Sequence, residues 1–262
     1  MRVLVSSLVV LLIAGCATTG TGVSTTTAEQ AVSQQATTSE TQQRAKVHTE
    51  LGALYLEAGR FGVAQDEARI AIGAEPSYAP AYNLLALVLM NLRENAAADE
   101  EFRRALRLAP NDPEINNNYG WFLCQTERVK ESVPHFMAAI KNPLYTTPAK
   151  AMTALGLCYL KLQDETAAED FLAKAVRVDP ASNEAKYWLA DIYYRKGRYS
   201  EARRLVGEVN KAVEPTAETT WLALRIERKI GDREGEARYA AQMRRKFQGS
   251  PEYQKLMQGQ YE

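Results

Sequence analysis

A repeat of about 34 residues constrains the fold of this chain more than any other feature. Five segments combine an apolar residue, a small neighbour and a second apolar residue four positions after the first: Leu51-Gly52-x-x-Tyr55, Leu85-Ala86-x-x-Leu89, Tyr119-Gly120-x-x-Leu123, Leu155-Gly156-x-x-Tyr159 and Leu189-Ala190-x-x-Tyr193. Successive copies lie 34, 34, 36 and 34 residues apart. Side chains four residues apart share one face of a helix. A period of this length therefore predicts stacked helical units.

Two further landmarks keep the same register. They lie twelve and sixteen positions after each small residue, as Ala64 and Ala68, Ala98 and Phe102, Ser132 and Phe136, Ala168 and Leu172, and Ala202 and Val206. Proline disfavours helix in the residue before it, and it closes units at Pro76, Pro110 and Pro180. The pattern resembles the tetratricopeptide repeat, W-x₂-L-G-x₂-Y…A-x₃-F…P. A non-repetitive helical bundle is the alternative.

The resemblance predicts an all-α fold, a solenoid of about six helical hairpins over residues 44–250. The expected units are 45–78, 79–112, 113–148, 149–182, 183–216 and a degenerate, capping 217–250. A C-terminal tail, 251–262, includes a short helix from Pro251 to Met257. The two extra residues of the third unit fall in the 141–148 loop, where two prolines oppose helix; the loop is a spacer or a partner contact.

The first 15 residues predict a lipoprotein signal peptide. One Arg precedes an apolar run, Val3 to Ala14, that is too short to cross a membrane as a helix. The following Leu-Ile-Ala-Gly-Cys resembles a bacterial lipobox, which implies lipidation of Cys16, and Ala17 after it implies the outer membrane. The alternatives are a plain signal peptide or a short buried helix. Residues 16–43 are rich in Thr, Ser and Gln, which predicts a flexible tether.

Composition argues against several functions. Thirty-two basic residues balance thirty-two acidic ones, so a nucleic-acid partner is not expected. Two histidines and three distant cysteines have no metal-site spacing. No catalytic motif is present, so we expect a protein that is not an enzyme and has no cofactor. His48 is interpreted as a packing residue, and His135 as a surface residue.

A concave groove is the expected binding site. In the tetratricopeptide pattern, positions 2, 5, 9, 12 and 13 of each unit face the groove. The chosen candidates are Leu56, Asn83, Leu87, Met90, Asn117, Trp121, Tyr187 and Tyr194. Asparagine amides can pair with the backbone of a bound segment, and apolar neighbours add desolvation. For each residue, ordinary packing between repeats is the alternative.

Cys124 and Cys158 lie in the first helices of successive units. Because such helices are neighbours in a solenoid, and because an envelope address permits oxidation, we predict a disulfide between them. Free buried thiols are the alternative.

Four motifs give a narrower resemblance. They are Asn-Asn-Tyr-Gly-Trp-Phe-Leu-Cys at 117–124, Asn-Pro-Leu-Tyr-x-x-Pro at 142–148, Gly-Leu-Cys-Tyr at 156–159 and Phe-Gln-Gly-Ser-Pro-Glu-Tyr-x-x-Leu at 247–256. With the lipobox and six repeats, they resemble the type IV pilus biogenesis lipoproteins PilF and PilW, the pilotins of the secretin.

That resemblance implies a lipid-anchored, monomeric protein on the periplasmic face of a Gram-negative outer membrane. Its partner would be the outer-membrane secretin (PilQ-like) or peptide segments of it. It would promote secretin localisation and multimerisation, and so pilus biogenesis and twitching motility. The alternatives are an adaptor of another envelope assembly, serving barrel assembly or cell-wall enzymes, and an envelope enzyme without a known motif.

Overall fold

A computed structural model describes residues 28–261 as helices and short connections, with no strand in that range. Its elements are η1 (Val32–Gln34), α1 (Glu40–Glu57), α2 (Phe61–Ala74), α3 (Ala79–Asn91), α4 (Asn95–Leu108), α5 (Pro113–Gln125), α6 (Val129–Lys141), α7 (Pro148–Lys161), α8 (Glu165–Val178), α9 (Asn183–Arg195), α10 (Tyr199–Ala212), α11 (Ala217–Ile230), α12 (Arg233–Lys246) and α13 (Pro251–Met257). The predicted all-α solenoid is confirmed.

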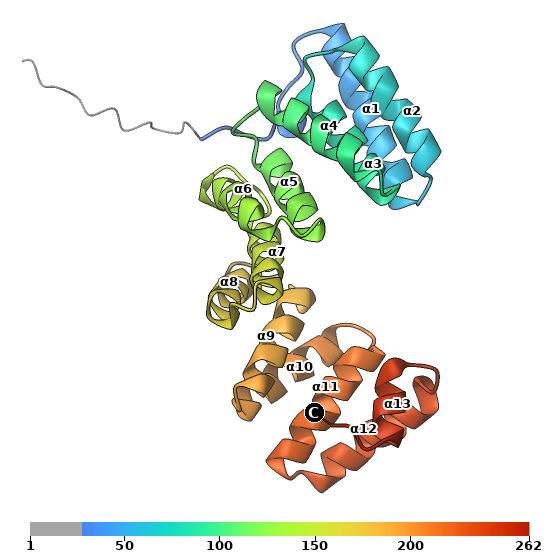
Figure 1. Ribbon diagram of the computed structural model, residues 1–262, viewed down its shortest axis with the longest axis vertical. Helices are drawn as coiled ribbons and strands as arrows, with labels where there is room; N and C mark the ends of the chain where they lie inside the picture. The colour runs from blue at the N-terminus through green and yellow to red at the C-terminus, as the bar shows by residue number, and fades with distance from the viewer. Residues whose placement is uncertain (1–27, 262) are drawn as a thin grey trace, which may run out of the picture.

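The helices pair into six antiparallel hairpins, α1–α2 through α11–α12, which follow one another along a curved array (Figure 1). The first helix of each hairpin also contacts the first helix of the next, from α1 against α3 to α9 against α11. The odd-numbered helices therefore form one continuous row, which we call the A row. Such a row lines the concave face of a helical-repeat solenoid.

The small residue of the repeat sets the distance between the helices of a hairpin. A Cβ added to Gly156 on α7 would lie 2.7 Å from Cγ of Leu172 on α8. A Cβ at Gly120 on α5 would lie 3.2 Å from ring atoms of Phe136 on α6. Leu172 and Phe136 are fully buried. The landmarks recognised in the sequence are thus the contact points of the hairpins.

A disulfide joins the third hairpin to the fourth. Cys124 on α5 and Cys158 on α7 are bonded, with their Cα atoms 5.9 Å apart. Both residues are fully buried among apolar side chains of the two repeats. The ammonium of Lys161 donates to the carbonyl of Cys124 over 3.2 Å, which adds a polar contact between the same two helices.

The segment before α1 differs from the predicted tether. Residues 28–35, which we call the strap, lie against the repeats. The backbone N–H of Val32 donates to the Asp112 carboxylate over 2.7 Å, and the Asn142 amide donates to the carbonyl of Glu29 over 2.7 Å. Ala31 is buried. Composition alone did not predict that the strap is ordered, because its hydrogen-bond partners come from the folded domain. The signal peptide 1–15 and Cys16 lie outside the described residues.

The chain after α12 folds back on the last hairpin. Helix α13 has the predicted bounds and packs against α11 and α12. Beyond it, the described chain returns across α11 (Figure 1). Across residues 28–261, we find no helix with both the length and the apolar character needed to cross a membrane.

Candidate protein-binding groove

A hollow of about 340 Å³ lies on the A row near the middle of the solenoid. Its lining comes from four successive odd-numbered helices: Leu87 on α3, Asn117, Asn118 and Trp121 on α5, Lys150, Ala154 and Leu157 on α7, and Glu184 on α9. The floor is apolar, and the exposed Lys150 and Glu184 bring one charge of each sign. This arrangement suits a segment that crosses several repeats.

Three asparagine amides connect along one side of the hollow. The Asn118 amide donates to Asn83 Oδ1, and the Asn117 amide donates to Asn118 Oδ1, each over 3.3 Å. Asn117 is 4% exposed, and its Oδ1 has no hydrogen-bond partner among the described residues. A buried amide oxygen without a donor costs about 1–3 kcal/mol. Asn117 Oδ1 is therefore an unsatisfied acceptor, which an N–H group of a bound segment can reach once the Asn117 side chain turns toward the hollow.

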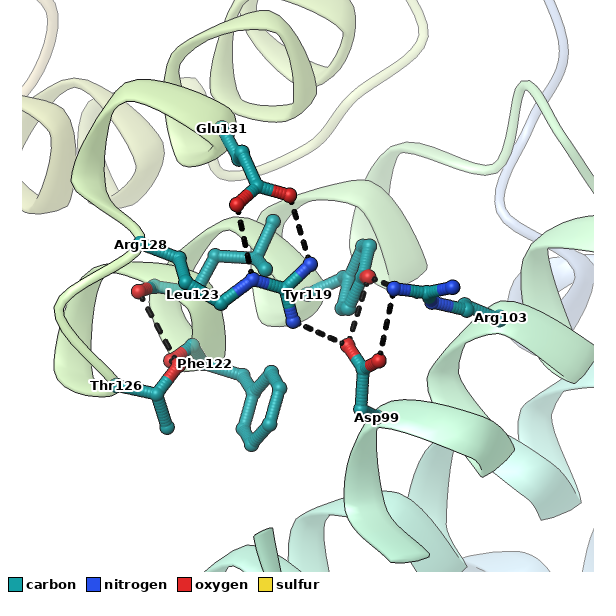
Figure 2. Close-up of polar contacts among 8 residues, drawn as sticks. All are labelled: Asp99, Arg103, Tyr119, Phe122, Leu123, Thr126, Arg128 and Glu131. Carbon is teal, nitrogen blue, oxygen red and sulfur yellow. Dashed lines mark hydrogen bonds and ion pairs between the residues drawn. The ribbon is translucent and has the colours of Figure 1, made fainter. Parts of the chain in front are cut away.

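The opposite face of α5 is held by a polar cluster (Figure 2). The Tyr119 hydroxyl donates to Asp99 on α4 over 2.8 Å, and the Arg128 guanidinium donates to the same carboxylate over 2.8 Å. Arg128 also donates to Glu131 on α6 over 2.7 Å, and this contact raises the pKa of Arg128. The cluster ties α4, α5 and α6 together, and so it fixes the helix that carries Asn117 and Trp121.

Each of the two histidines connects the two helices of its own hairpin. His48 Nδ1 lies 2.6 Å from a Glu67 carboxylate oxygen, a contact between α1 and α2. The interpretation of His135 as a surface residue is wrong. It is half-buried, its Nδ1 lies 3.0 Å from Asn116 Oδ1, and its ring meets the Tyr119 ring edge-on at 4.8 Å. Burial lowers the pKa of His135.

The structure brings some of the predicted groove residues together and separates others. Leu87, Asn117 and Trp121 line the hollow, and Asn83 borders it through Asn118. Leu56 and Met90 are half-buried against the apolar core of the first three hairpins and do not line it.

The two tyrosines predicted on α9 lie outside this hollow. Tyr187 is half-buried beside Trp188, with ring centroids 5.3 Å apart, and burial raises its pKa to about 12. Tyr194 is 7% exposed and contacts the chain beyond α13. Sequence reasoning placed Tyr194 at the groove surface because it could not anticipate that a later segment contacts it.

Five lining residues were not among the candidates, and the repeat offers a signal for three of them. Lys150 and Glu184 hold the second position of the fourth and fifth units, and Leu157 holds the ninth position of the fourth; the pattern assigns both positions to the groove. Asn118 and Ala154 hold the sixth position of the third and fourth units. This position is outside the general pattern, so the hollow extends the expected surface by one helix position.

The described part of the chain contains no evident metal site. Between residues 28 and 261, no group of three or more His, Cys, Asp or Glu side chains is arranged to hold a metal ion. The groove residues are amides, apolar side chains and two exposed charges, a set suited to non-covalent recognition of protein.

Comparison with known proteins agrees with this architecture. The type IV pilus assembly protein PilF of Pseudomonas aeruginosa is 29% identical over 209 residues, which are 80% of this chain and 83% of that protein. A solved structure of pilF from the same species matches with a TM-score of 0.79 and 28% identity over 84% of this chain and all of that chain. The structure of PilW, a widely conserved type IV pilus biogenesis factor, matches with a TM-score of 0.74 and 29% identity over 81% of this chain and 98% of that one.

The repeats themselves match a family model. A tetratricopeptide repeat family matches residues 79–214, which include the helices around the hollow. The chain belongs to the tetratricopeptide repeat family and is homologous to PilF.

Proposed function

We propose that this chain is a pilotin, an outer-membrane lipoprotein that binds the secretin of a type IV pilus and promotes its localisation and multimerisation. The observation that carries the binding role is the hollow on α3, α5, α7 and α9, where the buried Asn117 Oδ1 lacks a donor. The similarity to PilF and PilW supports the pilus as the setting. The chain acts by binding, without catalysis.

The hollow takes an extended segment of the secretin. A backbone N–H of that segment donates to Asn117 Oδ1, and an apolar side chain packs on Trp121 and Leu87. The row of connected amides pre-orients Asn117, because the other end of that amide is already bonded to Asn118. Because the hydrogen bond is to the backbone, affinity comes from the main chain, and the apolar floor selects the side chain.

The lipid on Cys16 keeps the complex at the membrane. More than one acyl chain is needed for stable anchoring. The strap then attaches the first described residues to the second and third repeats through Asp112 and Asn142. The binding domain therefore has a defined attachment site for its anchor.

The first experiment removes the gene and follows heat-stable secretin multimers and twitching. Deletion should abolish both, and the wild-type gene should restore them. Trp121→Ala and Asn117→Leu should fail to restore multimers while keeping a wild-type circular dichroism spectrum. Leu108→Ala is the matched control, because Leu108 is 43% exposed at the end of α4, away from the A row. Normal multimers in the deletion strain would refute the proposal and favour an adaptor of another envelope assembly.

The second experiment concerns the anchor. Cys16→Ala should move the protein out of the outer-membrane fraction and leave secretin multimers misplaced. Membrane fractionation unchanged by this substitution would contradict the lipid anchor and leave the groove proposal intact.

A further inference from the structure

A group of aromatic and arginine side chains lies at the C-terminal end of the A row, and Tyr261 of this chain is packed against it. The Tyr261 ring stacks on Trp221 of α11, with centroids 5.6 Å apart and planes 23° apart. The Arg228 guanidinium lies 4.0 Å from the centre of the same ring. The Tyr194 hydroxyl of α9 donates to the Tyr261 carbonyl over 3.4 Å. We call Tyr194, Trp221, Arg225 and Arg228 the aromatic cradle.

Part of the cradle is held by contacts that do not involve Tyr261. The Arg225 guanidinium lies 4.6 Å from the Tyr194 ring centre and 5.8 Å from that of Trp221, so it bridges α9 and α11. Asp191 holds Arg225 from the α9 side at 3.6 Å. The Arg225 Nε is buried and has no hydrogen-bond partner among the described residues. Cation–ring contacts strengthen where water is excluded, so this arrangement favours a bound aromatic side chain.

The residues between α13 and Tyr261 make few contacts with the solenoid. Helix α13 ends in a Schellman turn, in which Gly259 has φ +67° and the Gln260 N–H donates to the Lys255 carbonyl over 2.9 Å. This turn sends the chain back toward α11. Gln258, Gly259 and Gln260 are exposed, whereas Tyr261 is half-buried. Within the segment 258–261, Tyr261 makes the main contact with the solenoid.

An open hollow lies beside Tyr261. A hollow of about 450 Å³ is bordered by Tyr194, Arg225, Arg228, Lys229, Gly259 and Tyr261. The one hydrogen bond to Tyr261 uses its backbone carbonyl, which every residue has. The contacts that select a residue are ring contacts. The recognised unit is therefore an aromatic side chain, whichever chain supplies it.

We propose that the aromatic cradle is a binding site for an aromatic residue in an extended segment of a partner protein, and that Tyr261 occupies it in competition with that partner. The site lies on α9 and α11, and it is separate from the hollow around Asn117. It therefore does not depend on the proposed pilus function. When a partner's Tyr or Phe enters, the segment 258–261 leaves, and the end of the groove opens.

The test uses a fluorescent peptide with the sequence of residues 257–262, Met-Gln-Gly-Gln-Tyr-Glu, and two versions with Phe or Ala in place of Tyr. Fluorescence anisotropy measures their binding to the chain, to a chain ending at Met257 and to Tyr261→Ala. The Tyr and Phe peptides should bind both altered chains saturably, and at least about tenfold more weakly to the unaltered chain. The Ala peptide should bind the altered chains about tenfold or more weakly than the Tyr peptide, because it lacks the ring and its cation contact.

Matched arginine variants locate the site. In the chain ending at Met257, Arg228→Gln should weaken the binding of the Tyr peptide. Arg204→Gln should leave that binding unchanged, because Arg204 lies on α10 and is 62% exposed. Equal binding of Tyr and Ala peptides, or equal binding by shortened and unaltered chains, would overturn the proposal. If both altered chains lose their helical circular dichroism, Tyr261 is a structural cap, and the proposal is also overturned. The assay contains no secretin, so failure of the pilus proposal does not affect it.

Discussion

Asp99 on α4 and Arg128, at the turn into α6, form an ion pair with 2.8 Å between Oδ1 and Nη1 that joins the second hairpin to the third. The same carboxylate accepts from the Tyr119 hydroxyl on α5 (Figure 2). The side chains of Asp99 and Arg128 are 21% and 30% exposed, so solvent screens the pair only in part. The contact between consecutive repeats thus has a polar centre beside its apolar core.

Asp99→Ala should lower the free energy of unfolding by about 1–3 kcal/mol, because it leaves the Tyr119 hydroxyl and the Arg128 guanidinium without this partner. Urea unfolding followed by circular dichroism measures the change. Glu131→Ala is the control: it removes the solvent-exposed partner of Arg128 and should cost clearly less. Equal effects of the two variants would show that Asp99 does not tie the repeats together.

The bond between Cys124 and Cys158 closes a loop of about 35 residues, given their separation of 34. In the chain-entropy model, such a loop contributes about 3–4 kcal/mol. The double variant Cys124→Ala, Cys158→Ala should therefore unfold at a lower urea concentration than the oxidised wild type. Reducing agent should lower the wild-type midpoint and leave the variant unchanged. Two thiols in the denatured, unreduced chain, beyond any from Cys16, would show that the bond does not form.

The hairpins could be predicted because their contacts are encoded at short, regular distances. Gly156 and Leu172 are 16 residues apart and belong to a pattern that recurs in each unit, so one repeat explains the others. The same regularity placed Asn117 and Trp121 on the groove side of α5. Helix periodicity determines which face a residue occupies.

Contacts between distant, non-repeating segments could not be predicted in this way. The Val32 N–H meets Asp112 80 positions later, and nothing periodic relates the two. Tyr194 faced the groove in the repeat pattern, but it donates to Tyr261, 67 residues further on. His135 looked like a surface residue because it follows Pro134 at the start of the second helix of its unit, whereas here Asn116 and Tyr119 lie against it. Each prediction that differs from the structure concerns a tertiary contact, which the local sequence pattern does not encode.

The strap offers a prediction based on one N–H group. Val32→Pro removes the donor to the buried Asp112 carboxylate, and Val32→Ala keeps that donor while removing two methyl groups from a partly buried side chain. The Pro variant should be about 1–3 kcal/mol less stable than the Ala variant, because a charged acceptor loses a hydrogen bond. Ala31, before the substituted position, has ψ 135°, which is compatible with a following proline.

Urea unfolding compares the stability of the two strap variants, and amide exchange at residues 29–35 reports whether the strap has detached. Equal stability with equal exchange would mean that the Asp112 contact does not hold the strap.

His135 should give the stability of the chain a measurable pH dependence. Burial, aided by the positive charge of Arg128 and opposed by Glu131, lowers its pKa below the ordinary 6.5. Between the lowered folded-state pKa and 6.5, the unfolded chain binds more protons than the folded one, so stability rises with pH. The contribution of neutral His135, whose Nδ1–H donates to Asn116 Oδ1, is fully present above pH 6.5 and is lost as pH falls through this window.

His135→Gln keeps an amide donor for Asn116 and does not titrate. The free energy by which wild type exceeds this variant should therefore be larger at about pH 7.5 than at about pH 5. Urea unfolding at both pH values measures it. Ala138→Gln is the control, because it places the same side chain at an exposed position of α6 and should shift stability equally at the two pH values. A wild-type advantage over His135→Gln that stays constant or grows toward acid pH would show that His135 is not held neutral by its burial.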